Sequence, residues 1–77
     1  MKFRELDTVV LNRDLPEHSL RRGDLGAIVH VYEPDGLEVE FVTASGNTEA
    51  LVAVAEEDVR AIAETDLVSV RSLQRSA

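Results

Sequence analysis

Apolar and polar residues alternate along the middle of the chain, and this pattern predicts two paired β-strands at residues 26–32 and 37–42. The faces of the first consist of Ala27, Val29 and Val31 and of Ile28, His30 and Tyr32. In the second, the two faces consist of Leu37, Val39 and Phe41 and of Glu38 and Glu40. Period-two alternation is typical of strands. Because Pro34-Asp35-Gly36 has the composition of a turn, the segment predicts a β-hairpin.

Three further strands are expected around this hairpin, at residues 6–11, 48–54 and 59–62. In the 48–54 strand, Leu51 lies opposite Ala50, Val52 and Val54, which favours a strand covered on both faces. Residues 55–58 indicate a single 3₁₀ turn, with Asp58 capping the bend before the last strand.

A long connection at residues 12–24 is rich in turn formers. Leu15 and Leu20 are its aliphatic residues, and we expect them to hold the loop against the core. We expect Gly23 and Gly26 where the chain turns tightly or where backbones approach closely. Together, five short strands, a long first loop and a late 3₁₀ turn predict an all-β fold, a small five-stranded SH3-like barrel.

The barrel is assigned to residues 1–63 and a C-terminal extension to residues 64–77. In the extension, Leu67, Val70 and Leu73 recur at helical spacing behind a possible cap at Thr65 or Asp66. Val68 and Val70 instead alternate as in a strand. Three interpretations stay open: a short helix over one barrel mouth, an extended arm that orders on a partner, and a flexible tail.

The composition is that of one small, acidic domain. The chain has 77 residues, no cysteine and a formal net charge of −7, and from Asp14 to Asp66 acidic residues outnumber arginines 13 to 3. This excess disfavours nucleic acid and suits a basic protein partner, although it also keeps a small protein soluble. No apolar run approaches the roughly 20 residues of a membrane span, and the N-terminus has no signal-peptide core. We therefore expect a cytoplasmic protein without a membrane partner.

Few residue patterns point to catalysis. His18 and His30 lack the spacing of a metal site, and the glycines at 23 and 26 precede a strand rather than the helix start that binds phosphate. Glu38 and Glu40 are placed on an outward strand face, where a solvated pair is more typical than an acid–base pair. We therefore expect no enzymatic activity, no cofactor and no metal.

The basic residues of the long loop offer an alternative site. Arg13, Arg21 and Arg22 form a cluster that suits a small anion or RNA, as in some barrels. The competing interpretation is salt bridging to neighbouring acids: Asp14, Glu17 and Asp24.

Two resemblances follow from these motifs. The stretch Gly23-Asp24-Leu25-Gly26-Ala27-Ile28-Val29 resembles SH3-like barrels of the KOW and nitrile-hydratase-subunit type. The chain also resembles small bacterial proteins grouped as domain-of-unknown-function family 4926. That resemblance covers about residues 3–62 and rests on the following motifs: Glu5-Leu6-Asp7, Val9-Val10-Leu11, Asp14-Leu15-Pro16-Glu17-His18 with Leu20, Gly23-Asp24-Leu25-Gly26, Val29-His30-Val31-Tyr32, Glu38-Val39-Glu40-Phe41-Val42 and Asp58-Val59-Arg60. It implies no catalytic residues, and it implies an antitoxin or immunity-like partner role beside a toxin-like protein.

The leading hypothesis is a protein-interaction module that binds and neutralises a basic, toxin-like protein. Its expected partner-binding residues are an aromatic anchor, an acidic face and an apolar clamp in the extension: Tyr32, Glu33, Asp35, Glu38, Glu40, Glu56, Glu57, Asp58, Leu67, Val70 and Leu73. An RNA-associated barrel is one alternative. A self-associating structural protein, a homodimer paired through an exposed edge strand, is the other.

Overall fold

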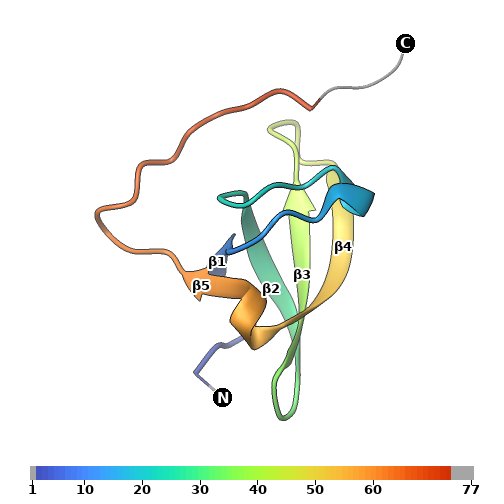
Figure 1. Ribbon diagram of the computed structural model, residues 1–77, viewed down its shortest axis with the longest axis vertical. Helices are drawn as coiled ribbons and strands as arrows, with labels where there is room; N and C mark the ends of the chain where they lie inside the picture. Colours follow the sequence, from blue (N-terminus) through green and yellow to red (C-terminus); the bar gives the residue numbers. More distant parts are fainter. Residues whose placement is uncertain (1, 74–77) are drawn as a thin grey trace.

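The computed structural model describes residues 2–73 and contains five strands and two 3₁₀ turns (Figure 1). The elements in chain order are β1 (Thr8–Leu11), η1 (Pro16–His18), β2 (Leu25–Tyr32), β3 (Gly36–Val42), β4 (Thr48–Ala55), η2 (Glu56–Asp58) and β5 (Val59–Ala61). The predicted all-β class, strand number, long first loop and 3₁₀ turn before the last strand are confirmed. The turn η1, which begins at Pro16, was not predicted.

All five strands form one antiparallel sheet in the order β4-β3-β2-β1-β5. The first and last strands are therefore neighbours, and β4 is the strand at the opposite end of the sheet (Figure 1). The hairpin predicted between residues 26 and 42 is the β2–β3 pair, in which Tyr32 lies opposite Gly36.

One cluster of buried apolar side chains fills the space that the sheet encloses. Every strand and the long loop contribute to it: Phe3, Val9, Leu11, Leu15, Leu20, Ile28, Leu37, Val39, Phe41, Val52, Val54 and Val59. The alternation predicted for β3 is confirmed, because Leu37, Val39 and Phe41 are all buried. Burial of such side chains is the main source of stability for a small domain.

The long loop is held against the core as its sequence predicts. Leu15 and Leu20 are buried, and their backbones form an isolated antiparallel bridge across η1. At the end of the loop, Gly23 has a φ of +95°, a conformation that L-residues rarely adopt. A Cβ on Gly26 would lie 2.5 Å from Val39 Cγ1, so this glycine permits close packing of β2 on β3.

A bulge corrects the faces predicted for β2. Ile28 pairs with Val39 and His30 pairs with Glu38, which leaves Val29 as an extra residue. Ile28 is buried and Val31 packs on the same core, although strict alternation places them on opposite faces. The bulge thus shifts the phase of the strand by one residue.

Two other strand expectations are wrong in part. The first strand begins at Thr8 and not at residue 6, because Leu6 adopts a left-handed φ of 74° and projects into solvent. The strand β4 is covered on one face only, since Leu51 is 54% exposed whereas Val52 and Val54 are buried. Its outer side is a solvent-facing surface of the sheet.

The described part of the C-terminal extension, residues 64–73, contains no helix or strand. The chain makes a turn that Asp66 stabilises by accepting a hydrogen bond from the Ala63 N–H at 2.7 Å. Beyond it, Leu67 and Val70 are 95% and 96% exposed. The extension runs away from β5 and passes back across the molecule as an arm (Figure 1). The predicted helix is therefore not present in residues 64–73, which form an irregular arm, and residues 74–77 of the predicted extension lie outside the described residues.

Candidate functional site

The residues of the predicted acidic face lie in separate parts of the structure and do not form one surface. The first, which we call the acidic end, consists of Asp35, Glu56 and Glu57. The hairpin turn and η2 meet here because the Glu56 N–H donates to the Asp35 carbonyl at 2.8 Å. Glu33 is exposed in the same hairpin turn. The hairpin and the 3₁₀ turn therefore bring together carboxylates that are about twenty positions apart in the sequence.

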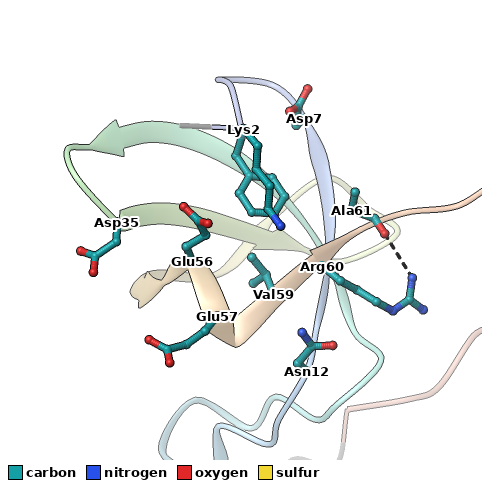
Figure 2. Close-up of a pocket in the computed structure, with 10 residues that line it drawn as sticks. Lys2, Asp7, Asn12, Asp35, Glu56, Glu57, Val59, Arg60 and Ala61 are labelled. Carbon is teal, nitrogen blue, oxygen red and sulfur yellow. Dashed lines mark hydrogen bonds between the residues drawn. The ribbon is translucent and has the colours of Figure 1, made fainter.

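The acidic end borders an open groove of about 670 Å³. Phe3 and Val59 contribute apolar surface, and the other lining residues are Lys2, Asp7, Asn12, Asp35, Glu56, Glu57, Arg60 and Ala61. Figure 2 shows the Asp35 and Glu57 carboxylates pointing outward on the η2 side, with the Arg60 guanidinium across the groove. The Lys2 Nζ lies 5.3 Å from the Phe3 ring centroid, in a cation–π contact. The groove thus combines an apolar floor with a mainly acidic rim.

A second group, the outer sheet face, carries Tyr32, Glu38 and Glu40. The Tyr32 hydroxyl donates to Glu38 Oε1 at 3.3 Å, and the negative charge of Glu38 raises the pKa of the Tyr32 phenol. The His30 and Tyr32 rings meet edge-on at 4.5 Å between centroids. Glu40 accepts a hydrogen bond from the Thr48 hydroxyl at 2.5 Å. Tyr32 remains 47% exposed, which suits an anchor at an interface.

Asp58 has a structural role within the fold. One carboxylate oxygen accepts from the Ala55 N–H at 3.0 Å, so Asp58 caps the bend as predicted. The other accepts from Arg13 Nε at 3.0 Å. Both oxygens are thus occupied inside the chain, which separates Asp58 from the carboxylates of the acidic end.

The basic cluster of the long loop is divided as well. Arg13 pairs with Asp58, across 45 positions, and not with the neighbouring acids that the sequence favours. The backbone N–H groups of Arg21 and Arg22 donate to Asp24 and Asp14 at 2.8 Å each. Within residues 2–73, neither of these two guanidinium groups forms an ion pair.

Arginines neutralise one of the acids predicted to bind a partner, Asp58, and two acids outside that set, Asp24 and Asp66. The Arg–carboxylate pairs among residues 2–73 are Arg13–Asp58, Arg60–Asp66 and Arg71–Asp24. The hydrogen bonds from Arg60 lower the pKa of Asp66 to about 2. By contrast, no Lys, Arg or His of the described chain pairs with the carboxylates of the acidic end. Within residues 2–73, the carboxylates of the acidic end therefore have no ion-pair partner, although Lys2 and Arg60 line the same groove.

The apolar clamp predicted in the extension does not form one surface. Leu67 and Val70 point into solvent, whereas Leu73 is partly buried beside a cavity of about 300 Å³ on the long loop. Arg71, which the sequence analysis missed, places it there by pairing with Asp24 and donating to the Ser19 carbonyl. A lone arginine in an irregular segment has no sequence signal that would identify this role.

The described histidines and carboxylates do not form a metal site. His30 Nδ1 lies 3.7 Å from a Glu5 carboxylate oxygen, and its ring contacts Tyr32. Over residues 2–73, no group of three or more metal-ligating side chains is close enough to hold an ion. The same residues include no helix that is long and apolar enough to cross a membrane.

Comparison with known proteins gives one match. The family model described as Domain of unknown function (DUF4926) matches residues 5–61, which include all five strands and both 3₁₀ turns. No curated protein and no solved structure matches the chain. The arm that follows β5 lies outside the matched region.

Proposed function

This chain belongs to the family described as Domain of unknown function (DUF4926), and from that premise we propose that it is a non-catalytic module that binds a basic protein partner. The observation that carries the proposal is the charge segregation described above. Asp24, Asp58 and Asp66 are paired with arginines, while Asp35, Glu56 and Glu57 have no ion-pair partner within residues 2–73 and border a groove with apolar surface from Phe3 and Val59. Opposite charge steers the encounter of two proteins, and apolar surface supplies the binding free energy.

A non-catalytic role also agrees with the burial of the polar groups. Among residues 2–73, no polar or charged side chain is buried. A general acid or base works best when burial moves its pKa toward neutrality. The acidic end lies in solvent and is better suited to contact than to proton transfer.

The partner that we propose is a toxin-like protein with a basic cleft, which this chain would neutralise in the cytoplasm. The carboxylates around the groove would occupy the positions of substrate phosphates in such a cleft. Tyr32 and the exposed arm residues Leu67 and Val70 would add apolar contacts at its margin.

The test is charge reversal at the acidic end with a matched control. The double variant Glu56→Lys, Glu57→Lys is compared with Glu17→Lys, Glu64→Lys, which changes two exposed acids outside the groove. Binding to the toxin-like protein that the family resemblance implies beside this chain, taken as the product of a neighbouring gene, is measured by titration calorimetry at several salt concentrations. We expect the first variant to lose about tenfold or more in affinity and most of the salt dependence. Equal affinities for both variants, or no binding to that protein, would contradict the proposal.

The RNA alternative rests on a separate observation, the guanidinium groups of Arg21 and Arg22, which form no ion pair with any residue from 2 to 73. Both lie on the long loop, and neither lines the groove beside the acidic end. A low-salt titration with single-stranded RNA distinguishes the two functions. Binding that is lost in Arg21→Gln, Arg22→Gln would favour RNA, and our proposal expects no binding by the unmodified chain.

A further inference from the structure

The strand β4 leaves one edge of the sheet open. It is the terminal strand next to β3, so only one of its sides is paired. The Glu56 N–H bonds to the Asp35 carbonyl, which makes these residues a hydrogen-bonded antiparallel pair continuing the β3–β4 register. Such pairs alternate along a ladder. The backbone groups of Val52 and Val54 therefore face β3, and those of Leu51 and Ala53 face the open side.

The end of this edge agrees with that alternation. The Ala55 N–H, two residues beyond Ala53, points away from β3 and is capped by Asp58. In the described chain, no backbone hydrogen bond reaches Leu51 or Ala53 from the open side. We call the N–H and C=O groups of these two residues the free edge.

Devices that normally protect an edge strand are missing from this part of β4. Residues 50–55 contain no charge, no proline and no glycine. The irregularity in the β3–β4 ladder lies at its other end, between Phe41 and Val42. Sheet edges are usually protected by lysines, prolines or bulges, because unpaired backbone groups recruit another strand. The free edge is therefore able to accept an added strand.

Charge on the neighbouring strand indicates what that added strand carries. Glu38 lies opposite Ala53 and Glu40 lies opposite Leu51, all on the outer sheet face. An added strand would run about 4.8 Å beyond β4. Only the Ala53 methyl group would separate its backbone from Glu38, and an extended Lys or Arg side chain is long enough to span that methyl. Opposite Leu51, an apolar side chain would be favoured.

We propose that the free edge of β4 binds an extended segment of the basic partner by strand addition, with a Lys or Arg opposite Ala53 and an apolar residue opposite Leu51. This inference rests on the proposed function, since it describes how such a partner would be held. A second copy of this chain suits the edge less well. Its β4 offers no cation, and pairing would bring the Glu38 and Glu40 carboxylates of both copies onto one continuous face.

The probe is a capped heptapeptide, Thr-Val-Lys-Val-Leu-Val-Thr, which places Lys opposite Ala53 and Leu opposite Leu51 when it pairs antiparallel. It is added to the full chain, with Thr-Val-Glu-Val-Leu-Val-Thr as the matched control. Hydrogen exchange of individual amides is followed by NMR. We expect the Lys peptide to slow exchange at Leu51 and Ala53 by about tenfold or more, with little change at Val52 and Val54, which already bond to β3. The Glu peptide should give no protection.

Three variants complete the test. Ala53→Lys places a positive charge between Glu38 and the Lys of the peptide, so it should repel the peptide and abolish protection. Unchanged exchange of the β3 amides would show that the variant keeps the fold. Glu38→Gln should weaken binding several-fold, and Glu17→Gln, an exposed acid of the long loop, should leave it unchanged. A spectrum that shifts only around Asp35 and Glu56 would place the peptide in the groove; it would overturn the edge proposal and leave the proposed function standing.

Three other outcomes would contradict strand addition by the basic partner. Equal protection by both peptides, or none by either, would overturn the proposal. Protection of Leu51 and Ala53 that rises with protein concentration in the absence of peptide would identify a second copy as the occupant, and would overturn it as well.

Discussion

Arg71 forms a two-point ion pair with Asp24, 47 positions earlier in the chain. Its Nε donates to Asp24 Oδ1 at 2.9 Å and its Nη2 donates to the other carboxylate oxygen. The same Nη2 donates to the Ser19 carbonyl at 3.0 Å. These contacts connect the C-terminal arm to the long loop between β1 and β2, and Leu67 and Val70 remain exposed between this point and β5.

Substituting Arg71→Gln should release the arm without unfolding the sheet. The arm packs few apolar side chains, so the ion pair is its main described attachment beyond Asp66. We expect amide exchange of residues 67–73 to become several-fold faster, and the free energy of unfolding to fall by less than about 1 kcal/mol. Arg22→Gln is the control, because that guanidinium has no described partner. An arm that exchanges at the same rate in both variants would show that Arg71 does not hold it.

The same ion pair should make the arm sensitive to acid. Burial raises the pKa of Asp24, but the hydrogen bonds from Arg71 and from the Arg21 N–H together lower it by more. The net pKa therefore lies below the usual value of 3.8. The unfolded chain then binds the proton more readily than the folded chain. The stabilisation of the folded chain by the Asp24–Arg71 pair is therefore complete above about pH 4, and it is lost as the pH falls through the pKa of Asp24 in the folded chain. Carboxyl-carbon NMR titration should show this low pKa, and Arg71→Gln should raise it.

Asp66 should behave in the same direction at the start of the arm. Hydrogen bonds from Arg60 and from the Ala63 N–H hold its pKa at about 2. Its contribution is therefore present above the unfolded pKa near 3.8 and disappears as the pH approaches 2. Arg60→Gln should move the Asp66 titration upward in the same NMR experiment and leave the Asp24 titration in place. A shared shift of both groups would mean that the two pairs are coupled.

The parts of the fold that follow short-range rules were predictable. Alternation in β3 identifies Leu37 and Phe41 as buried, because side chains of a strand alternate in direction whatever the rest of the chain does. Leu15 and Leu20 stand out as the aliphatic residues of a polar loop. Gly26 lies where β2 and β3 approach closely, as expected for a glycine at the start of a strand.

Features that depend on residues far apart in the sequence were not predictable. The bulge at Val29 arises from the pairing of His30 with Glu38, which periodicity within β2 cannot reveal. The division of the acidic set has the same origin. Asp58 and Asp24 are neutralised by arginines 45 and 47 positions away, and composition alone gives each carboxylate the same weight.

Gly26→Ala should destabilise the sheet through overpacking. A Cβ at this position would lie 2.5 Å from Val39 Cγ1 and 2.8 Å from Phe41 Cε1, and both side chains are buried with little room to move. We expect the free energy of unfolding to fall by about 1–3 kcal/mol. Gly23→Ala provides a contrast, since its Cβ would meet open space and only the φ of +95° is unfavourable. Urea denaturation should therefore rank Gly26→Ala as the more damaging change.

Leu37→Ala should be severe in a domain of this size. Leu37 is fully buried, so its truncation removes apolar contact and leaves a cavity, at about 2–5 kcal/mol. Leu67→Ala makes the same chemical change at a side chain that is 95% exposed, and should alter stability by less than about 0.5 kcal/mol. Thermal denaturation followed by circular dichroism compares the two. Similar midpoints would contradict the core described here.

Asp58 and Glu57 are adjacent acids that should respond in opposite ways to substitution. Asp58→Ala removes the cap on the Ala55 N–H and the pair with Arg13, so we expect a loss of about 1–2 kcal/mol of stability. Asp58→Asn keeps an oxygen for the cap and should lose less. Glu57→Ala removes an exposed carboxylate that has no described cation and should leave stability unchanged. If the acidic end binds a basic protein, Glu57→Ala weakens that binding, and Asp58→Ala does not when it is measured below its melting temperature. The opposite ranking would mean that the partner recognises the η2 turn as a fold element and not through its free charge.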